Sequence, residues 1–412
     1  MRLLFLCALL LGGAPALAAG KPAALEPVED TRADLAASHA PEPTESPATI
    51  LVKEPAYRSE RPLYLALELG DAKDRFISGV LDESAGTGSG YDTLYLDANH
   101  NGDLTDDAPV KLEIKKERNR TEWTTGVVPV KVKYCDGATR ALGLKLRIET
   151  SRYAGLSEDS VSWSIGYSIA HRLQGKVDIG GKEVLVALLD GEGEHHQVNG
   201  CFDDYGVDRL LIDVDGKGTL DPKKGEFPLS KGISFGGKLW SVETNAAATR
   251  LLITPCDLPA GKVKFAAKFP DGAKVSKARA NLTNHAGYAF ACDLSGETPH
   301  LLPAGEYRVP SGTLTVQDAE GTEWTGTFSL PKPICIEPDK ESAVAFGVPV
   351  SVEPLVTGRL KLGGAISVAH RFIGAGGERY SDIAAAGKRE APSVKLLDAE
   401  GIEVAQGKME YG

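Results

Sequence analysis

The residues best suited to chemistry lie in the stretch DANHNGDLTDD, residues 97–107, where side-chain oxygens recur at every second position. Those whose oxygens could converge on one point are Asp97, Asn99, Asn101, Asp103, Asp106 and Asp107. Gly102 stands where such a loop must turn sharply, because glycine tolerates the positive φ of a tight turn. A hard divalent cation takes about six to eight oxygen ligands of these kinds. The stretch therefore predicts a Ca²⁺ site.

The competing interpretation of this stretch is a solvated turn, since Asp, Asn and Gly are also the usual turn formers. Without a cation, however, its aspartates would bring like charges together, and each pair at about 4 Å costs on the order of 1 kcal/mol even in water. A plain turn has no need of that repulsion. The spacing thus favours a bound cation, and His100, at an even-numbered position of the loop, is expected to point away from it.

Two other loops carry related residues. The stretch DVDGKGTLD and a following glutamate contribute the candidate ligands Asp213, Asp215, Thr219, Asp221 and Glu226. Lys217 occupies the fifth position of that loop, where an ammonium group would oppose a cation unless it swings outward. A third stretch repeats the pattern around an insertion that carries His195 and His196, and its candidates are Asp190, Asn199 and Asp203. For both loops, a solvated turn without metal is the alternative.

The amino terminus predicts export. Residues 1–19 combine Arg2 with an apolar run and a small-residue cleavage site, which is the layout of a signal peptide rather than of a membrane span. We therefore expect a periplasmic or extracellular protein without membrane insertion. The net charge of −11 argues against nucleic acid as a partner, because an acidic chain repels phosphate.

The cysteines beyond the signal contain no CxxC pair, which argues against structural zinc. Their number is odd, so at least one thiol stays unpaired. The sequence leaves two alternatives open, either one disulfide among Cys256, Cys292 and Cys335 or buried free thiols.

Alternation of apolar and polar residues predicts β-strands through most of the chain. Residues 128–134 and 142–148 alternate on either side of an Asp-Gly turn, and Gly-Gly pairs at 180–181 and 236–237 mark two further hairpins. We expect an antiparallel β domain over residues 50–250, with aspartate-rich loops between its strands. Residues 20–49, rich in Pro, Ala and acidic residues, predict a flexible linker before that domain.

The remaining part, residues 251–412, contains an internal echo. The stretches TLTVQDAEGTEWTG at 313–326 and VKLLDAEGIEVAQG at 394–407 both predict a strand, a turn and a strand. The segment LPAGEYRV at 302–309 resembles a strand entrance of transthyretin-like and carboxypeptidase-regulatory-like β-sandwiches. That resemblance implies one immunoglobulin-like β-sandwich here, or two that divide near residue 350. The predicted fold class is thus mainly β.

The first aspartate loop also resembles a dockerin or EF-hand calcium loop. With the preceding YDTLYLD and the later DRLLIDVDGKGTLD, it is similar to an uncharacterised group of secreted bacterial proteins with aspartate-rich loops between β-strands. Ala108 occupies the twelfth position, where an EF-hand has a bidentate Glu, and the preceding residues alternate like a strand. The resemblance therefore implies structural calcium binding and not calcium sensing by helix opening.

These features favour an exported calcium-binding scaffold or binding protein, with a glycan or a surface protein as its partner. A sugar-stacking platform could come from Trp123, Trp163, Trp240 and Trp324. Because a Trp in a β protein is more often part of the core, an exposed pair would discriminate between the two roles. The alternative function is a calcium-stabilised secreted hydrolase such as a glycosidase, but the sequence marks no catalytic carboxylate pair. A degenerate GxSxG motif at 166–170 is predicted to be a strand, and no catalytic residue is assigned.

Overall fold

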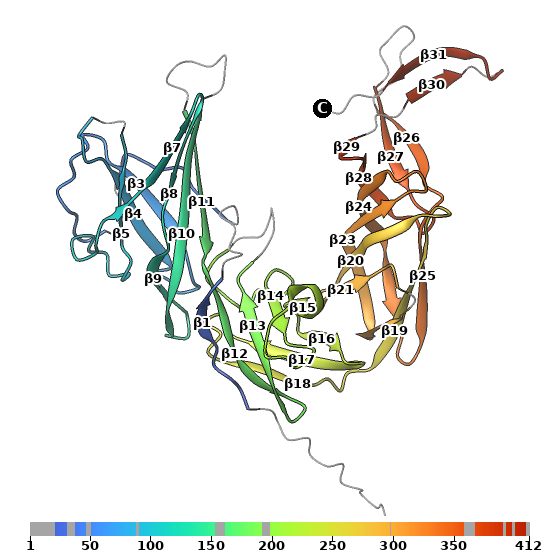
Figure 1. The fold of residues 1–412 in the computed structure, drawn as a ribbon, viewed down its shortest axis with the longest axis horizontal. Coiled ribbons are helices and arrows are strands. Elements are labelled where there is room, and N and C mark those ends of the chain that lie inside the picture. The colour runs from blue at the N-terminus through green and yellow to red at the C-terminus, as the bar shows by residue number, and fades with distance from the viewer. Residues whose placement is uncertain are drawn as a thin grey trace, which may run out of the picture.

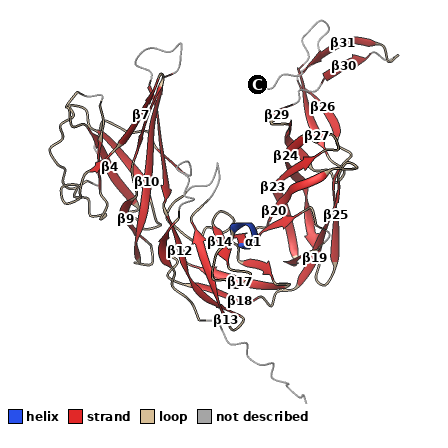
Figure 2. Ribbon diagram, viewed as in Figure 1, coloured by secondary structure: helices blue, strands red, loops and turns tan. Residues whose placement is uncertain are grey.

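The computed structural model describes residues 21–30, 38–46, 51–87, 90–152, 161–191, 198–296, 298–357, 367–389, 393–397 and 400–408. The chain folds almost entirely into β-strands, as predicted, and forms two β-rich arms that meet at a β-rich base (Figure 1; Figure 2). The helix found among the described residues is the four-residue α1, Pro222–Gly225. In the same residues, no helix has the length and apolar character needed to cross a membrane.

The first arm contains two antiparallel sheets that share one hydrophobic core. The first sheet consists, in order, of β3 (Leu63–Glu68), β4 (Phe76–Asp82), β5 (Thr93–Leu96) and β6 (Val110–Lys111). The second consists, in order, of β2 (Ser38–Ala40), β11 (Val161–Ile169), β10 (Thr139–Arg152), β8 (Arg120–Thr124) and β7 (Glu113–Glu117), with β9 (Val128–Lys133) paired to β10. The alternation predicted the β9–β10 hairpin, and its inward-facing Val130, Val132, Leu144 and Leu146 are buried.

The base continues the same core through two further antiparallel sheets. One consists, in order, of β1 (Glu26–Glu29), β12 (His171–Ile179), β13 (Lys182–Leu189), β14 (Arg209–Ile212) and β15 (Glu226–Pro228). The other consists of β16 (Gly232–Phe235), β17 (Lys238–Thr244) and β18 (Leu251–Pro255). Both predicted Gly-Gly hairpins form, because all four glycines adopt the positive φ that a tight two-residue turn requires.

The segment at 20–49 is not a free linker in its described part, so that prediction is wrong there. β1 pairs with β12, β2 pairs with β11, and Leu25 is fully buried in the core. The composition argument missed this because edge strands offer unpaired backbone groups, and a short segment can satisfy them without much apolar content of its own.

The second arm is the expected β-sandwich. Its large sheet consists, in order, of β21 (Ala289–Asp293), β20 (Lys274–Thr283), β23 (Gly305–Gln317), β24 (Glu323–Ile336), β28 (Arg379–Ala385), β27 (Ser367–Ile373) and β26 (Ser351–Thr357), with β29 (Lys388–Arg389) paired to β28. Its small sheet consists of β22 (His300–Pro303), β19 (Ala260–Lys268) and β25 (Glu341–Gly347), and β19 and β25 run parallel. Phe265, Tyr307, Phe328 and Phe346 fill the core between the sheets.

Two predicted boundaries shift. β18 pairs with β17 and its Leu251 is fully buried in the first core, so the boundary at 250 falls inside a sheet and belongs after Pro255. Near residue 350 the chain does not start a new unit in its described part, since β26 and β27 extend the large sheet. The second copy of the internal echo forms a separate hairpin, β30 (Ser393–Leu397) with β31 (Glu403–Lys408).

Of the two alternatives for the cysteines, the structure has free thiols and not a disulfide among its described residues. In the described residues the unpaired cysteines are Cys135, Cys201, Cys256, Cys292 and Cys335. Cys201 and Cys292 are buried, and burial raises the pKa of each thiol, so neither is a reactive thiolate.

Candidate cation loops

Asp97 closes the first loop. It directly follows β5, it is 2% exposed, and its carboxylate accepts the backbone N–H of Asn101 at 2.8 Å and that of Gly102 at 2.9 Å. Gly102 has a φ of +82°, a conformation that residues with a side chain rarely adopt. The polar residues therefore curl the backbone around one buried carboxylate.

A second carboxylate ties the loop from its other end. Asp106 accepts a side-chain N–H of Asn99 at 3.1 Å through Oδ1 and one of Asn101 at 2.8 Å through Oδ2. Asn101 in turn accepts the backbone N–H of Asp103 at 2.7 Å. The structure thus joins the side chains of four of the six predicted ligands, Asp97, Asn99, Asn101 and Asp106, in one hydrogen-bonded network, to which Asp103 contributes its backbone N–H.

Two acceptor oxygens beside this network lack a donor. Oδ1 of Asn99 and Oδ2 of Asp107 are buried and accept no hydrogen bond from the described part of the chain. Burial raises the pKa of Asp107 to about 6, and the charges of Asp106 and Asp97 add to the effect. An unsatisfied buried acceptor is costly, and so is a carboxylate held beside two others. Asn99 and Asp107 also line an open hollow of about 600 Å³, through which a small ion can approach the loop.

The carboxylate of Asp103 interacts with Thr105 and Lys53 and not with the other acidic residues of the loop. Its Oδ1 accepts the N–H of Thr105 at 2.8 Å, and its Oδ2 lies 3.3 Å from Nζ of Lys53. The Thr105 hydrogen bonds, followed by the contact with Lys53, hold the pKa of Asp103 below its ordinary value. His100, predicted to point away from the cation, lies with Nδ1 at 3.3 Å from the carbonyl oxygen of Lys131.

The second loop repeats the backbone curl of the first. Asp213 is 7% exposed and accepts the N–H of Lys217 at 3.1 Å and of Gly218 at 2.6 Å. This is the same relation that Asp97 has to the residues four and five positions after it. The shared arrangement shows that an aspartate in this position can serve a purely structural purpose, by satisfying backbone donors in a turn.

The other acids of the second loop are already compensated. Asp215 lies 3.1 Å from Nζ of Lys217 and 3.3 Å from Nζ of Lys224, and these lysines, Lys217 first, lower its pKa. Asp221 accepts the N–H of Lys223 at 3.0 Å and so caps α1. The remaining predicted ligands are Thr219, which is exposed, and Glu226, which lies in β15 opposite Leu211. The described contacts do not converge on a cation here.

The third loop repeats the hydrogen bonds of the first loop between residues on either side of its insertion. Asp190, 8% exposed, accepts the N–H of Asn199 at 3.3 Å and that of Gly200 at 2.5 Å. Asn199 donates its side-chain N–H to Asp204 at 2.8 Å, as Asn101 does to Asp106 in the first loop. The insertion itself, with His195 and His196, lies outside the described residues.

The sequence missed one member of the third loop, Asp208. It is fully buried and accepts the N–H of Gly191 at 3.0 Å and that of Asp204 at 2.9 Å. Burial raises the pKa of Asp208, repulsion from Asp190 adds to this, and burial also raises the pKa of Asp190. Asp203 is only partly buried, and burial together with the charge of Asp204 raises its pKa. Asp208 directly precedes β14 and lies outside the alternating Asp and Asn positions of the loop, so the spacing did not single it out.

Across the described residues, no three His, Cys, Asp or Glu side chains are grouped closely enough to hold a metal ion by themselves. In the first loop, the oxygens of Asp97 and Asp106 are committed to N–H donors of the loop. A cation there would depend on amide and backbone oxygens as well as on carboxylates, a mixture that Ca²⁺ accepts. No family model, curated protein or solved structure matches this chain.

The four tryptophans do not form an exposed pair. Trp123 and Trp163 stack with ring centroids 5.7 Å apart, and Trp123 is only 6% exposed. Trp240 is also buried, at 8% exposed. Trp324, in contrast, is 38% exposed and donates its indole N–H to Asp318 at 2.8 Å. Trp123, Trp163 and Trp240 therefore pack in or against the hydrophobic core, and Trp324 is on the surface.

The GxSxG-like segment is a strand, as predicted. Ser168 lies within β11, opposite Lys145 of β10, and is 2% exposed. A nucleophile elbow instead places its serine on a sharp exposed turn between strand and helix. Ser168 thus does not have the geometry of a nucleophile.

Proposed function

We propose that this protein is an exported scaffold or binding protein whose first aspartate loop binds Ca²⁺ in a structural role. The observation that carries the proposal is the pair of buried acceptors, Oδ1 of Asn99 and Oδ2 of Asp107, which lie without a donor beside the network of Asp97 and Asp106. A divalent cation bound to them would satisfy both oxygens and offset the repulsion that raises the pKa of Asp107.

The proposal concerns the first loop and not the other two. In the second loop, lysine ammonium groups already neutralise Asp215. In the third loop, Asp190 and Asp208 each accept two backbone N–H groups, so their oxygens serve to close the backbone. Asp107 also accepts backbone N–H groups, from Ala98 and Asn99, but its Oδ2 and the Oδ1 of Asn99 are buried without a donor in the described residues.

The size of the effect fits structural reinforcement. With free Ca²⁺ outside the cell near about 1 mM and a Kd of about 0.1 mM, one site stabilises the fold by roughly 1.4 kcal/mol. Typical domains are stable by about 5 to 15 kcal/mol, so one ion reinforces the first arm without creating it. No catalytic role is needed for this contribution.

The proposal also states where the protein acts and which class of partner it binds. The signal-like sequence of residues 1–19 supports a periplasmic or extracellular location, where calcium is available. The two-armed all-β form suits recognition of a glycan or a surface protein, with the exposed indole of Trp324 as one contact.

Equilibrium dialysis of the chelator-treated chain against labelled Ca²⁺ tests the metal site directly. We expect about one ion per chain with a Kd of about 0.1 to 1 mM, and weaker binding of Mg²⁺, which demands a stricter octahedral shell. Asp107→Asn should abolish the site, whereas the matched variant Asp215→Asn, in the lysine-compensated loop, should leave it intact. Absence of binding at about 1 mM Ca²⁺, or equal binding by both variants, would refute the proposal.

A further inference from the structure

The large sheet of the second arm carries two cross-strand pairs of threonine on its outer face. Thr313 of β23 lies directly opposite Thr327 of β24, and Thr315 lies opposite Thr325. Successive side chains of a strand point to opposite faces, and Leu314, between the two threonines of β23, packs against the core of the sandwich. The four threonines therefore point away from that core, and we call the surface they form the threonine face.

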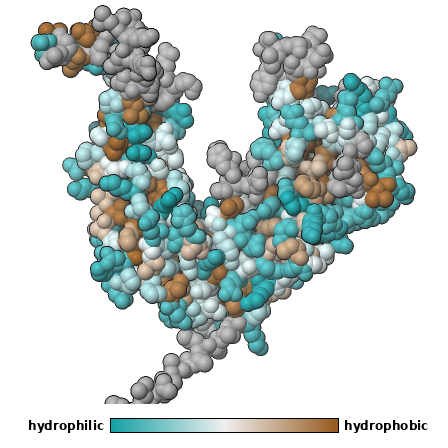
Figure 3. Space-filling view, turned by 180° about the vertical axis from the view of Figure 1, so that it is seen from behind, coloured by the Kyte–Doolittle hydropathy of each residue, from teal (hydrophilic) through white to brown (hydrophobic). Residues whose placement is uncertain are grey.

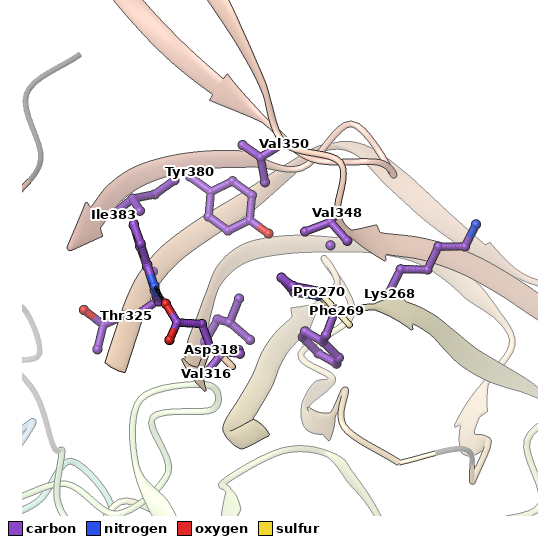
Figure 4. Close-up of a pocket in the computed structure, with 14 residues that line it drawn as sticks. Lys268, Phe269, Pro270, Val316, Asp318, Thr325, Val348, Val350, Tyr380 and Ile383 are labelled. Carbon is purple, nitrogen blue, oxygen red and sulfur yellow. Dashed lines mark hydrogen bonds between the residues drawn. The ribbon is translucent and has the colours of Figure 1, made fainter. Parts of the chain in front are cut away.

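A hollow of about 200 Å³ lies over the threonine face. Lys277 of β20 bounds it on one side and Asp382 of β28 on the other, so the hollow crosses neighbouring strands from β20 to β28. On the inner side of the same sheet lies a different hollow, which is apolar and is lined by Val316 and Tyr380 among others (Figure 4). This part of the sheet thus has one apolar and one polar side.

The hydroxyl groups of the threonine face are free to bind a ligand. Thr313, Thr325 and Thr327 are exposed and Thr315 is half-buried, and none of the four hydroxyls has a hydrogen-bond partner within the described part of the chain. Each hydroxyl offers one donor and two acceptor positions. Neighbouring strands lie about 4.8 Å apart, so a row of side chains from β20 to β24 spans about 10 Å. Such an array suits a ligand that itself carries hydroxyl groups at regular intervals.

Two cations border the threonine rows without an ion-pair partner. Lys277 and Arg279 both lie on β20, one beside each row, and both are exposed. Neither forms an ion pair with another described residue. Asp293 lies across from Arg279 on β21, but its Oδ1 accepts the backbone N–H of Ser295 at 2.8 Å and the hydroxyl of Ser295 at 2.6 Å. The face therefore presents two positive charges with no carboxylate in contact.

Cations in comparable strand positions of the first arm are paired. Arg147 of β10 lies 2.8 Å from Glu122 of β8, and Lys115 of β7 lies 2.9 Å from Glu117. The chain has 57 acidic and 46 basic residues, so carboxylate partners are plentiful. Two unpaired cations beside free hydroxyls therefore indicate an anionic ligand, whose charge would take the place of an acidic side chain.

We propose that the threonine face binds an acidic glycan, that is, a chain of sugar residues that carry carboxylates. A carboxylate binds Lys277 and Arg279, and the planar guanidinium holds both carboxylate oxygens at once. The ring hydroxyls exchange hydrogen bonds with the threonines. At the far end of the hollow, Asp382 accepts a hydrogen bond from a sugar hydroxyl, and Arg389, 2.9 Å away, offsets its charge.

The hollow favours acidic over neutral glycans. No aromatic side chain is among the described residues that line it, so a sugar ring has nothing to stack on. Ion pairs and hydrogen bonds must then supply the affinity. Figure 3 shows, from behind, that the second arm stands apart from the first arm above the base, so an extended polymer can pass along it.

This inference names the class of glycan and in that respect rests on the proposed function, but it uses a different surface. Trp324, the glycan contact named above, lines the apolar hollow on the inner side of the sheet. The threonine face also requires no calcium. The two proposals can therefore fail separately.

Isothermal titration calorimetry of the full chain with oligogalacturonate, in EDTA, tests the proposal. We expect a Kd on the order of 100 μM at about 50 mM NaCl, and several-fold weaker binding at about 500 mM NaCl because salt screens the charges. Methyl-esterified oligogalacturonate has the same sugars without the charge, and polyglutamate has the charge without the sugars. Each should bind at least about tenfold more weakly.

Paired substitutions locate the site. Lys277→Gln with Arg279→Gln should weaken binding at least about tenfold. The matched control is Lys262→Gln with Lys264→Gln, which removes two cations at the same spacing from β19 of the small sheet and should bind as the wild type does.

The threonines test recognition of the sugar itself. Thr315→Val with Thr325→Val removes two hydroxyls but keeps the branched shape of both side chains, so it should weaken binding about three- to tenfold. A Tm close to that of the wild type shows for each variant that a loss of binding is not a loss of folding.

Three outcomes overturn the inference. One is absence of binding at about 1 mM oligogalacturonate. Another is equal binding of the esterified ligand or of polyglutamate. The third is full affinity in the variant with Lys277→Gln and Arg279→Gln.

Trp324→Ala distinguishes this inference from the proposed function, and it should leave binding of oligogalacturonate unchanged. If it abolishes binding while the variant without Lys277 and Arg279 binds normally, the glycan contact lies at Trp324 and the threonine face is not the site. A protein that binds no calcium leaves these results untouched, because they are measured in EDTA.

Discussion

Replacing Asp107 by Asn separates a calcium site from a structural turn, because the two interpretations predict opposite consequences. In a chelator, burial raises the pKa of Asp107 from the ordinary 3.8 to about 6, and repulsion from Asp106 and Asp97 adds to that rise. Without solvent screening, that rise in pKa corresponds to a free-energy cost of about 3 kcal/mol for the charged form. Because the site is partly exposed, screening by solvent reduces this cost to about 1 kcal/mol. Asp107→Asn removes this penalty.

The variant should therefore be more stable than the wild type in EDTA at neutral pH, by about 1 kcal/mol, or about 2 to 4 °C in Tm for an arm of this size. With about 1 mM Ca²⁺, the wild type should gain about 1.4 kcal/mol, or roughly 3 to 6 °C. The variant should gain almost nothing, since it has lost a charged ligand. The difference between the two proteins should thus vanish or reverse when calcium is added.

Calorimetry of the wild type, Asp107→Asn and the control Asp215→Asn, each with EDTA and with Ca²⁺, measures all of these terms. Asp215 lies between two lysines, so its replacement should lower stability slightly and leave the calcium response unchanged. If none of the three proteins responds to calcium, the loop is a solvated turn. If Asp107→Asn responds as the wild type does, Asp107 is not a ligand and the reasoning from its unsatisfied oxygen is wrong.

Three further predictions follow from the same structure. In EDTA, Tm should fall as pH rises from about 5 to about 8. The buried Asp190 and Asp208 have raised pKa values, so over this range the folded chain holds more protons than the unfolded chain, whose aspartates titrate near about 3.9. Asp208→Asn should make Tm depend less on pH, and a Tm that rises with pH would contradict the prediction. Gly102→Ala should cost about 1 to 2 kcal/mol in a denaturant titration because its φ is +82°, whereas Gly126→Ala, with nothing within 4 Å of the added methyl, should cost far less; equal losses would remove the backbone argument. A glycan array and chromogenic glycosides should show binding without turnover, and turnover would establish the hydrolase alternative in place of the binding protein.

The sequence located the local elements of this protein because they depend on short-range patterns. Alternation along residues 128–134 places every second side chain on one face, so the β9–β10 hairpin and its buried valines could be predicted without any knowledge of the rest. The Gly-Gly turns, and the curl of the first loop around Asp97, follow equally from the residues involved.

Tertiary structure determined which of these loops retains buried oxygens that no donor or cation of the protein satisfies. Asp97, Asp190 and Asp213 occupy equivalent places in three similar loops, yet Lys224 reaches the second loop from α1 and compensates its charge. Asp208, at the far end of the third loop, accepts the N–H of Gly191 at its beginning. Whether a carboxylate oxygen is neutralised, satisfied by backbone donors or left without a donor depends largely on what other segments bring to it, and of these contributions the spacing within the loop indicated only that of Lys217.

The pairing of the amino-terminal segment was decided in the same way. Pro and Ala at residues 20–49 determined a low intrinsic tendency to fold, and only the exposed edges of β11 and β12 turned parts of that segment into strands. The sequence by itself therefore determined strands, turns and loop curvature, which are local. The sheets and the compensated charges arose from contacts between different segments, where free energy depends on burial and on neighbours.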